Sequence, residues 1–300
     1  MAALTYAAEA GLDVVNMSYY VDPWLYNCDS ADDYVSGPVT EEELEEQAFT
    51  KETVSAALTY AHEAGVTLVA SAGNGFTDLS QPTRFDDSSP DYPEGSEIER
   101  TVTDDCLDMP AEGPHVITVG STGPSTDKSD FSNYGLGSID VAAPGGWYRD
   151  FFGTDQFSVP ANMVLAPYPL QPAIDEELVD ENGVPLDDFT LVGCDSQGTN
   201  CGLYTYLQGT SMASPHVTGV VALVIEAHGE GNRARGYSLD PDTVRSIIES
   251  TATDTACPAG GVEDYTDEGR PVEWNATCTG TLDDNGFYGE GIVDAAAAVG

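Results

Sequence analysis

Helix-forming segments alternate with short apolar runs along the first part of this chain. Two ten-residue segments, Ala2–Gly11 (AALTYAAEAG) and Ala56–Gly65 (AALTYAHEAG), are identical except that His62 stands where the first copy has Ala8. Each consists of good helix formers and closes on glycine, the residue that most often follows the last turn of a helix. Both segments therefore predict a helix.

Each predicted helix leads directly into an apolar run of strand length. Leu12–Met17 and Val66–Ala70 are partly β-branched, and a third such run follows at His115–Gly120. Helix-then-strand units in succession favour parallel strands joined by right-handed crossovers. Two further helices are expected, at Asp242–Thr251 directly after a proline and at the alanine-rich tail Ile292–Val299. The pattern predicts an α/β fold with a mostly parallel sheet.

The longest apolar run, Val217–Ala227, is too short to span a membrane and predicts a buried helix. Just before it stands the segment Gly209–His216 (GTSMASPH), which places Ser211 at the mouth of that helix. Pro215 is expected in the first turn, where a missing N–H has no intrahelical partner anyway. The free N–H groups and the helix dipole favour developing negative charge, so Ser211 is a candidate nucleophile. The alternative for such a serine is a helix N-cap.

Two long polar segments interrupt the predicted elements, at about 75–114 and 146–205. The first is acidic and rich in proline, serine and aspartate; the second contains two cysteines. Loops of this length in a compact domain are usually functional or disordered. We expect both insertions to rim the site.

The charge balance of the chain is strongly acidic. Aspartate and glutamate number 52 against 9 lysines and arginines, a formal net charge of −43. Such a surface repels phosphates, which excludes nucleic acid as a partner, and it tolerates salt because screening relieves the self-repulsion. A halophilic source and an acidic secreted bacterial protein both fit. The acidic run at residues 41–46 is expected to be a solvated helix start or loop.

Six cysteines without a Cys-x-x-Cys motif favour disulfides in an oxidising compartment over zinc or redox chemistry. Six cysteines allow fifteen pairings, and free buried thiols remain the alternative. Short separations favour two of the pairs and leave the third, which gives Cys194–Cys201, Cys257–Cys278 and Cys28–Cys106.

Several ordered motifs resemble those of the subtilisin-like serine peptidases, the subtilase family. The resemblance covers nearly the whole chain outside the insertions and implies a three-layer α/β fold, with residues 1–300 forming a partial catalytic domain that is incomplete at its N-terminal side. The matching motifs are Asp13–Ser18 (DVVNMS), Val69–Gly75 (VASAGNG), Phe131–Gly135 (FSNYG) with Asp140–Gly145 (DVAAPG), Gly209–Gly219 (GTSMASPHVTG) and Gly286–Gly291 (GFYGEG).

The resemblance implies a role for several of these residues. Ser211 would attack a peptide carbonyl, and Asn74 would donate its side-chain amide to the oxyanion beside the N–H of Ser211. Without the serine motif, an asparagine before glycine would be read as a turn. Two exposed strand edges would sandwich an extended peptide substrate. Tyr19 and Tyr20 stand where the family usually has small residues, so its pocket preferences do not carry over. The edge residues are Ser18, Tyr19, Ser71, Ala72 and Gly73.

The resemblance also implies an aspartate and a histidine that stand before the first strand, in the chain order Asp, His, Ser. Neither motif is found upstream of the serine motif. His216 lies five positions beyond Ser211 on the same predicted helix, about 140° around it, and His62, His115 and His228 are expected to be structural or exposed. We therefore expect an N-terminally truncated serine endopeptidase domain that is inactive as given. The alternative is a non-catalytic subtilase-like protein that binds peptides.

The chemistry requires no cofactor, although subtilases often carry structural calcium. Asp86-Asp87 and Asp187-Asp188 are candidate ligands, without the spacing of a defined calcium loop. A polypeptide substrate, a monomer and an extracellular or cell-surface location are expected. The start of the chain lacks the basic and apolar regions of a signal peptide.

Overall fold

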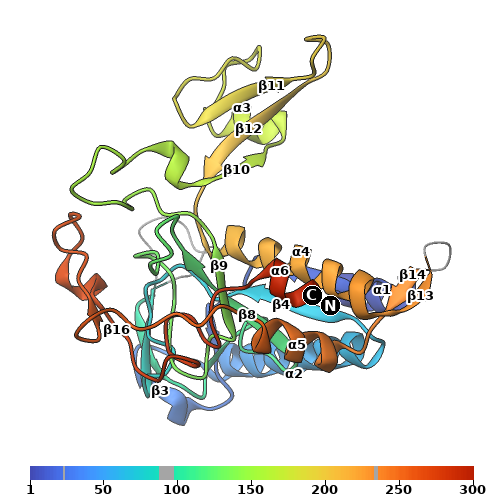
Figure 1. Ribbon diagram of the computed structural model, residues 1–300. Coiled ribbons are helices and arrows are strands. Elements are labelled where there is room, and N and C mark those ends of the chain that lie inside the picture. The colour runs from blue at the N-terminus through green and yellow to red at the C-terminus, as the bar shows by residue number, and fades with distance from the viewer. Residues whose placement is uncertain (23, 88–97, 233–235) are drawn as a thin grey trace.

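A four-stranded parallel sheet lies at the centre of the protein. The computed structural model describes residues 1–22, 24–87, 98–232 and 236–300 (Figure 1). The strand order is β1-β4-β8-β9, with Val14 opposite Thr67 and Leu68 opposite Val116. Three of these strands fall on the predicted apolar runs, and β1 forms one edge of the sheet. The strands are β1 (Val14–Met17), β4 (Thr67–Ser71), β8 (Val116–Thr122) and β9 (Val141–Pro144).

Helices cover both faces of this sheet, which confirms the predicted three layers (Figure 1). Successive side chains of a strand point to opposite faces, so Leu68 packs with α1 and α2 while Val69 packs with the other helices. The first layer consists of α1 (Ala2–Ala10) and α2 (Glu41–Glu63), and the second of α4 (Thr210–His228), α5 (Pro241–Ser250) and α6 (Ala295–Val299).

The helix ends follow from local chemistry. Gly11 closes α1 in the left-handed conformation at φ 68°, as the glycine of the repeat predicted. The second copy of the repeat forms only the last part of the 23-residue helix α2. That helix begins in the acidic run, where Thr40 Oγ1 accepts the N–H of Glu43 and Glu43 accepts the N–H of Thr40. This capping box and the adjacent carboxylates explain why an acidic run starts a helix.

Strands of the first insertion pair with two short strands from the segment before α2. β3 (Tyr34–Ser36), β6 (Arg100–Thr103) and β5 (Thr83–Asp86) pair in that order, and β7 (Leu107–Asp108) pairs with β2 (Tyr26–Asn27). Residues 88–97 lie outside the described residues. The second insertion contains the antiparallel sheet β10-β12-β11 and projects from the body at the top of Figure 1. Its elements are β10 (Val164–Pro167), α3 (Leu170–Asp175), β11 (Thr190–Cys194) and β12 (Cys201–Leu207).

Short elements complete the chain. Two-stranded ladders form between β13 (Glu230–Asn232) and β14 (Gly236–Ser238), and between β15 (Val262–Glu263) and β16 (Ala276–Thr277). Single 3₁₀ turns lie at Ala31–Asp33, Pro160–Asn162 and Val272–Trp274. Within the described ranges, no helix is both long and apolar enough to cross a bilayer.

All three predicted disulfides form. Cys28–Cys106 joins the end of β2 to the residue before β7, across 78 positions of sequence. Cys194–Cys201 joins the two strands of the β11–β12 hairpin where they meet its loop, and Cys257–Cys278 closes a loop of the C-terminal part. Each disulfide therefore stabilises a part of the chain that lies outside the central sheet.

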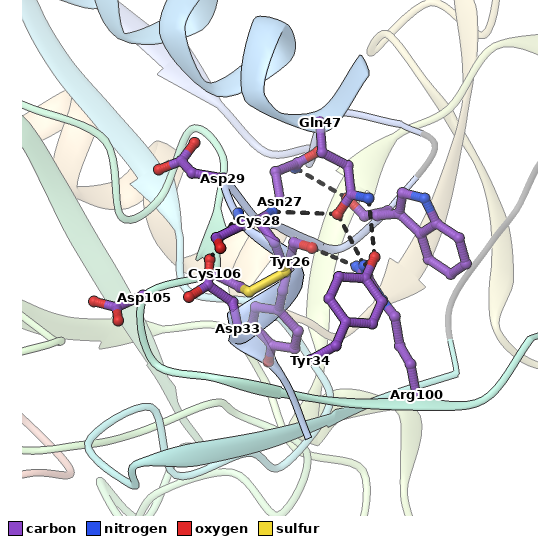
Figure 2. Close-up of a disulfide and its surroundings, with 12 residues drawn as sticks. Tyr26, Asn27, Cys28, Asp29, Asp33, Tyr34, Gln47, Arg100, Asp105 and Cys106 are labelled. Atoms are coloured by element: carbon purple, nitrogen blue, oxygen red, sulfur yellow. Dashed lines mark hydrogen bonds between the residues drawn. A yellow bond between two sulfur atoms is a disulfide. The ribbon is translucent and has the colours of Figure 1, made fainter. Parts of the chain in front are cut away.

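A buried arginine lies beside the first disulfide (Figure 2). Arg100 has a fully buried side chain and forms an ion pair with Asp86 at 2.7 Å. Its Nη1 donates to Tyr34 Oη and Gln47 Oε1, its Nη2 donates also to the carbonyl of Tyr26, and the guanidinium stacks 4.0 Å from the ring centre of Trp24. Gln47 Oε1 in turn accepts the N–H of Cys28. This network joins β6, β2 and α2 through one cation.

Replacement of Arg100 by methionine should lower the free energy of unfolding by about 3–5 kcal/mol, because it removes the cation from a buried pair and leaves its partners inside. Urea denaturation measures the change. The matched control is Lys51→Gln, which removes a pair whose carboxylate, Asp29, is 56% exposed, and it should cost about 1 kcal/mol or less. Equal costs for the two variants would contradict this account.

Candidate active site

Ser211 is the second residue of α4, directly after Gly209 and Thr210, so the structure confirms its predicted place at a helix N-terminus. The predicted place of Pro215 was wrong. This proline lies inside the helix, beyond the first turn, where a residue normally donates its N–H to the carbonyl four positions earlier. The carbonyl of Ser211 therefore lacks its helical partner.

Ser18 supplies the missing hydrogen bond. Its Oγ donates to the carbonyl of Ser211 at 2.9 Å and also contacts Ser214 Oγ at 2.8 Å. Since the single hydroxyl hydrogen of Ser18 is already used, Ser214 is the donor in the second contact. Asn16 Nδ2 also donates to Ser18 Oγ, at 2.9 Å. Ser18, predicted as a substrate-binding residue, thus joins the N-terminal part of α4 to the residue after β1.

The orientation of the Asn74 side chain is fixed by its partners. Its Oδ1 accepts both the backbone N–H and the Oγ1 hydrogen of Thr210, each at 2.9 Å. A backbone N–H can only donate, so the atom facing it must be the amide oxygen. The Nδ2 group then has no acceptor among the residues that the structure describes and can donate to an oxyanion.

Thr210 connects the two halves of the site. It is fully buried, and its Oγ1 accepts the N–H of Gly73 at 3.1 Å while donating to Asn74. Gly209 precedes it with φ 154°. A Cβ at Gly209 would lie 3.5 Å from Asn74 Nδ2 and 3.6 Å from the backbone nitrogen of Ser211. Asn74 Nδ2 and the backbone nitrogen of Ser211, the two donors predicted for the oxyanion, therefore both lie close to the position that a side chain at residue 209 would occupy.

A cavity of about 560 Å³ opens beside these residues. Of the predicted substrate-binding residues, Ser18, Tyr19, Ser71 and Gly73 line it. Ala72 does not, because it is buried and its N–H donates to Val119 while its carbonyl accepts from Asn133. The first insertion contributes lining residues as expected, whereas the second contributes none among the described residues. The cavity is completed by Tyr20, Asp22, Leu25, Asn74, Gly75, Asp87, Asp108 and Ser211.

One lining residue, Asp108, was not expected from the sequence. It is 3% exposed, and burial, followed by the negative charge of Glu112, raises its pKa well above the usual value. The chain before it, with Cys106 in a disulfide and β7 paired to β2, holds it at the cavity. Neither its spacing nor its neighbours form a motif, so only the tertiary structure shows it.

None of the four histidines lines this cavity. His216 Nδ1 contacts the carbonyl of Met212 on its own helix at 2.8 Å, and His228 Nε2 contacts the carbonyl of Ala298. His62 contacts Asp242, and its ring stacks on that of His115. The structure thus gives all four histidines contacts outside the cavity, and the expectation that none of them is the base of Ser211 stays a prediction.

The predicted calcium ligands fit an ion poorly where their partners are described. Asp86 is fully buried in its pair with Arg100. Asp187 Oδ1 accepts the N–H groups of Phe189 and Thr190, as in a turn. Calcium binding stays a prediction.

Comparison with known proteins identifies the family. Residues 1–275 match the model of the subtilase family, peptidase S8, and the chain belongs to this family of serine peptidases. It is 30% identical over 205 residues to fervidolysin from Fervidobacterium pennivorans, and the matched residues make up 67% of this chain and 20% of fervidolysin. Over 148 residues it is 30% identical to pyrolysin from Pyrococcus furiosus, 47% of this chain and 10% of the relative.

The solved structures show the same fold. A lanthipeptide protease superposes with a TM-score of 0.56 at 24% identity, over 99% of this chain and 64% of that one. The chain thus spans a minor part of these two curated relatives, 10% and 20% of their length, and 64% of this structural neighbour.

Replacement of Thr210 by valine should lower the free energy of unfolding by about 1–3 kcal/mol, because the partly buried N–H of Gly73 loses its acceptor. Chemical denaturation measures the change. Thr210→Ser is the matched control, since it keeps the hydroxyl and removes only a methyl group, for about 1 kcal/mol. If serine were as costly as valine, packing and not the hydroxyl would hold this junction.

Proposed function

We propose that this protein is a serine endopeptidase whose nucleophile is Ser211 and whose oxyanion donors are the N–H of Ser211 and Nδ2 of Asn74. The observation that carries the proposal is the pair of hydrogen bonds from Thr210 to Asn74 Oδ1, which leaves Nδ2 as the free donor beside the nucleophile. A turn asparagine would not need this fixed orientation.

The reaction follows the family chemistry in two halves. Ser211 Oγ forms a bond to the substrate carbonyl carbon as its proton passes to a general base, and the carbonyl oxygen takes up negative charge between the two donors. The C–N bond then breaks, and the base returns the proton to the leaving amine. A water molecule hydrolyses the resulting ester by the same steps and releases Ser211.

By this proposal the general base and its orienting acid are not among the described residues, since none of the four histidines lies at the cavity. In subtilisin, loss of the histidine alone lowers kcat about 10⁶-fold. The rate that remains is still about 10³–10⁴ times that of the uncatalysed reaction in water. The chain as given is therefore essentially inactive by this proposal. A segment that bears the aspartate and histidine motifs of the family would complete it.

Polypeptides are the proposed substrates, and the extracellular space or the cell surface is the proposed location. Three disulfides support an oxidising compartment. The net charge of −43 supports solubility outside a cell. A monomer is proposed as the working unit, with no cofactor in the chemistry.

A fluorophosphonate probe, which reacts with activated serines, tests the catalytic proposal. The 300-residue chain alone should label very slowly. The same chain supplied with a segment that carries the family's aspartate and histidine motifs should label rapidly at Ser211, and Ser211→Ala should abolish labelling. In the completed protein, Asn74→Ala should lower kcat about 10²–10³-fold, the loss measured for this donor in subtilisin.

Two outcomes would overturn parts of this proposal. Rapid labelling of the chain alone would show that a base lies within these residues. A completed, folded protein that binds extended peptides without hydrolysing them would support the non-catalytic, peptide-binding alternative.

A further inference from the structure

Asp108 lines the cavity of the candidate site, close to Gly73, the residue that precedes Asn74. Its Oδ2 is 3.6 Å from the position that a Cβ on Gly73 would take. Its Oδ1 is buried and has no hydrogen-bond partner among the described residues. A buried carboxylate oxygen without a partner is costly, so this atom indicates a place for a partner that the described residues do not supply.

The positive charge of Arg84 opposes the rise in the pKa of Asp108, but no hydrogen bond joins these two described residues. Arg84 Nη1 and Nη2 donate to the two carboxylate oxygens of Glu112 at 2.5 and 2.7 Å. The same guanidinium also donates to the carbonyls of Cys106 and Leu79. Glu112 in turn accepts the N–H of Asp108. The charges of Arg84 and Glu112 cancel, and the charge of an ionised Asp108 remains.

The rest of the cavity suits a cationic side chain with an apolar stem. Asp22 and Asp87 add exposed acids to its lining, and none of the described lining residues is a lysine, arginine or histidine. Tyr19, Tyr20 and Leu25 offer apolar surface. Lysine and arginine bury their methylene stems against such surface while the charged end finds a polar partner.

We propose that this cavity accepts the side chain on the acyl side of the cleaved bond and selects lysine or arginine there, with Asp108 as the partner of the cationic end. The inference rests on the proposed function, because Ser211 and Asn74, which share the cavity, fix where the substrate carbonyl lies. The side chain nearest that carbonyl is the one that enters. Arginine can occupy both carboxylate oxygens at once, and lysine one.

A matched pair of peptides tests the proposal on the 300-residue chain without requiring catalysis. One peptide carries arginine at the position before the bond, and the other carries citrulline, which has nearly the same shape and no charge. The arginine peptide should bind at least about 10-fold more tightly by calorimetry, since hydrogen bonds between charged groups are the stronger kind. Asp108→Asn should remove the difference, and circular dichroism should show that this variant is folded.

The pH profile separates a binding role from a structural one. Because the pKa of Asp108 is raised, the preference for arginine should grow as the pH rises and the carboxyl ionises, whereas Asp108→Asn should show no such growth. The control Asp22→Asn removes an exposed acid from the same cavity and should keep most of the preference. Equal binding of the two peptides by the wild type, or an unchanged preference in Asp108→Asn, would overturn the proposal. Slow or fast labelling of Ser211 bears on the proposed function alone.

A second, independent observation concerns the one position at which the two copies of the repeat differ. His62, in the last turn of α2, contacts Asp242 of α5 with Nε2 and Oδ1 3.0 Å apart. Its ring stacks on that of His115, with centres 3.9 Å apart and planes 13° from parallel. One ligand atom from each of the three residues lies within 4.8 Å of the others. None of the three lines the Ser211 cavity.

Two imidazoles and a carboxylate are the donor set of zinc sites that keep a fourth position open. Further acids surround the group, since Glu63, Glu230 and Asp240 line the same surface cavity as His62. This negative field attracts a divalent cation. We infer that His62, His115 and Asp242 bind one Zn²⁺ and so join the ends of α2 and α5 to the start of β8.

Titration with Zn²⁺ by calorimetry tests this second proposal. One site per chain is expected, and Co²⁺ in the same site should show the absorption of tetrahedral coordination. His62→Ala, which makes the second copy of the repeat identical to the first, should weaken binding at least about 10-fold, as should Asp242→Asn. His216→Ala, at an exposed histidine elsewhere, is the matched control and should have no effect. No binding by the wild type, or equal losses in His62→Ala and His216→Ala, would overturn the inference.

Discussion

The site depends on the contact between Thr210 and Asn74. These residues stand 136 positions apart, one at the start of α4 and the other just beyond β4. Two hydrogen bonds to one amide oxygen determine the orientation of the Asn74 amide. A third, from the N–H of Gly73 to Thr210 Oγ1, joins the chain just beyond β4 to the start of α4. A nucleophile and an oxyanion donor on separate elements need such a connection, because small displacements at an active site cost much rate.

A proline inside α4 adds a second connection to the sheet. Pro215 leaves the carbonyl of Ser211 without a helical donor, and Ser18 at the end of β1 provides one. An interior proline usually destabilises a helix. Here its consequence is a hydrogen bond between the nucleophile's own peptide group and the sheet, so two strands and one helix together position Ser211.

The sequence predicted most of the central fold because its signals are local. Glycine after each repeat, the period of the apolar runs and the short cysteine separations each reflect neighbouring residues. Residues 146–205 were expected to be a loop, yet they form a sheet whose short strands contain glycine and cysteine. Asp108 carries no local signal at all. Its position depends on the Cys28–Cys106 disulfide, which the cysteine separations predicted, and on the ladder between β7 and β2, which they did not.

The acidic charge of the chain bears on what the cavity beside Ser211 can bind. Five described cations are held in ion pairs, and each of the buried pairs Arg84–Glu112 and Arg100–Asp86 includes a residue of β5. Only 9 lysines and arginines stand against 52 acids, so the negative charge of the remaining acids is left for solvent and ligands. On most of the surface this charge is hydrated and screened within about 10 Å at moderate salt. The charge of Asp108 is less hydrated and less screened, because this residue is buried in the lining of the cavity. By our proposal, an acid that would attract cations only weakly on the surface therefore produces a specific preference for a cationic side chain in the cavity.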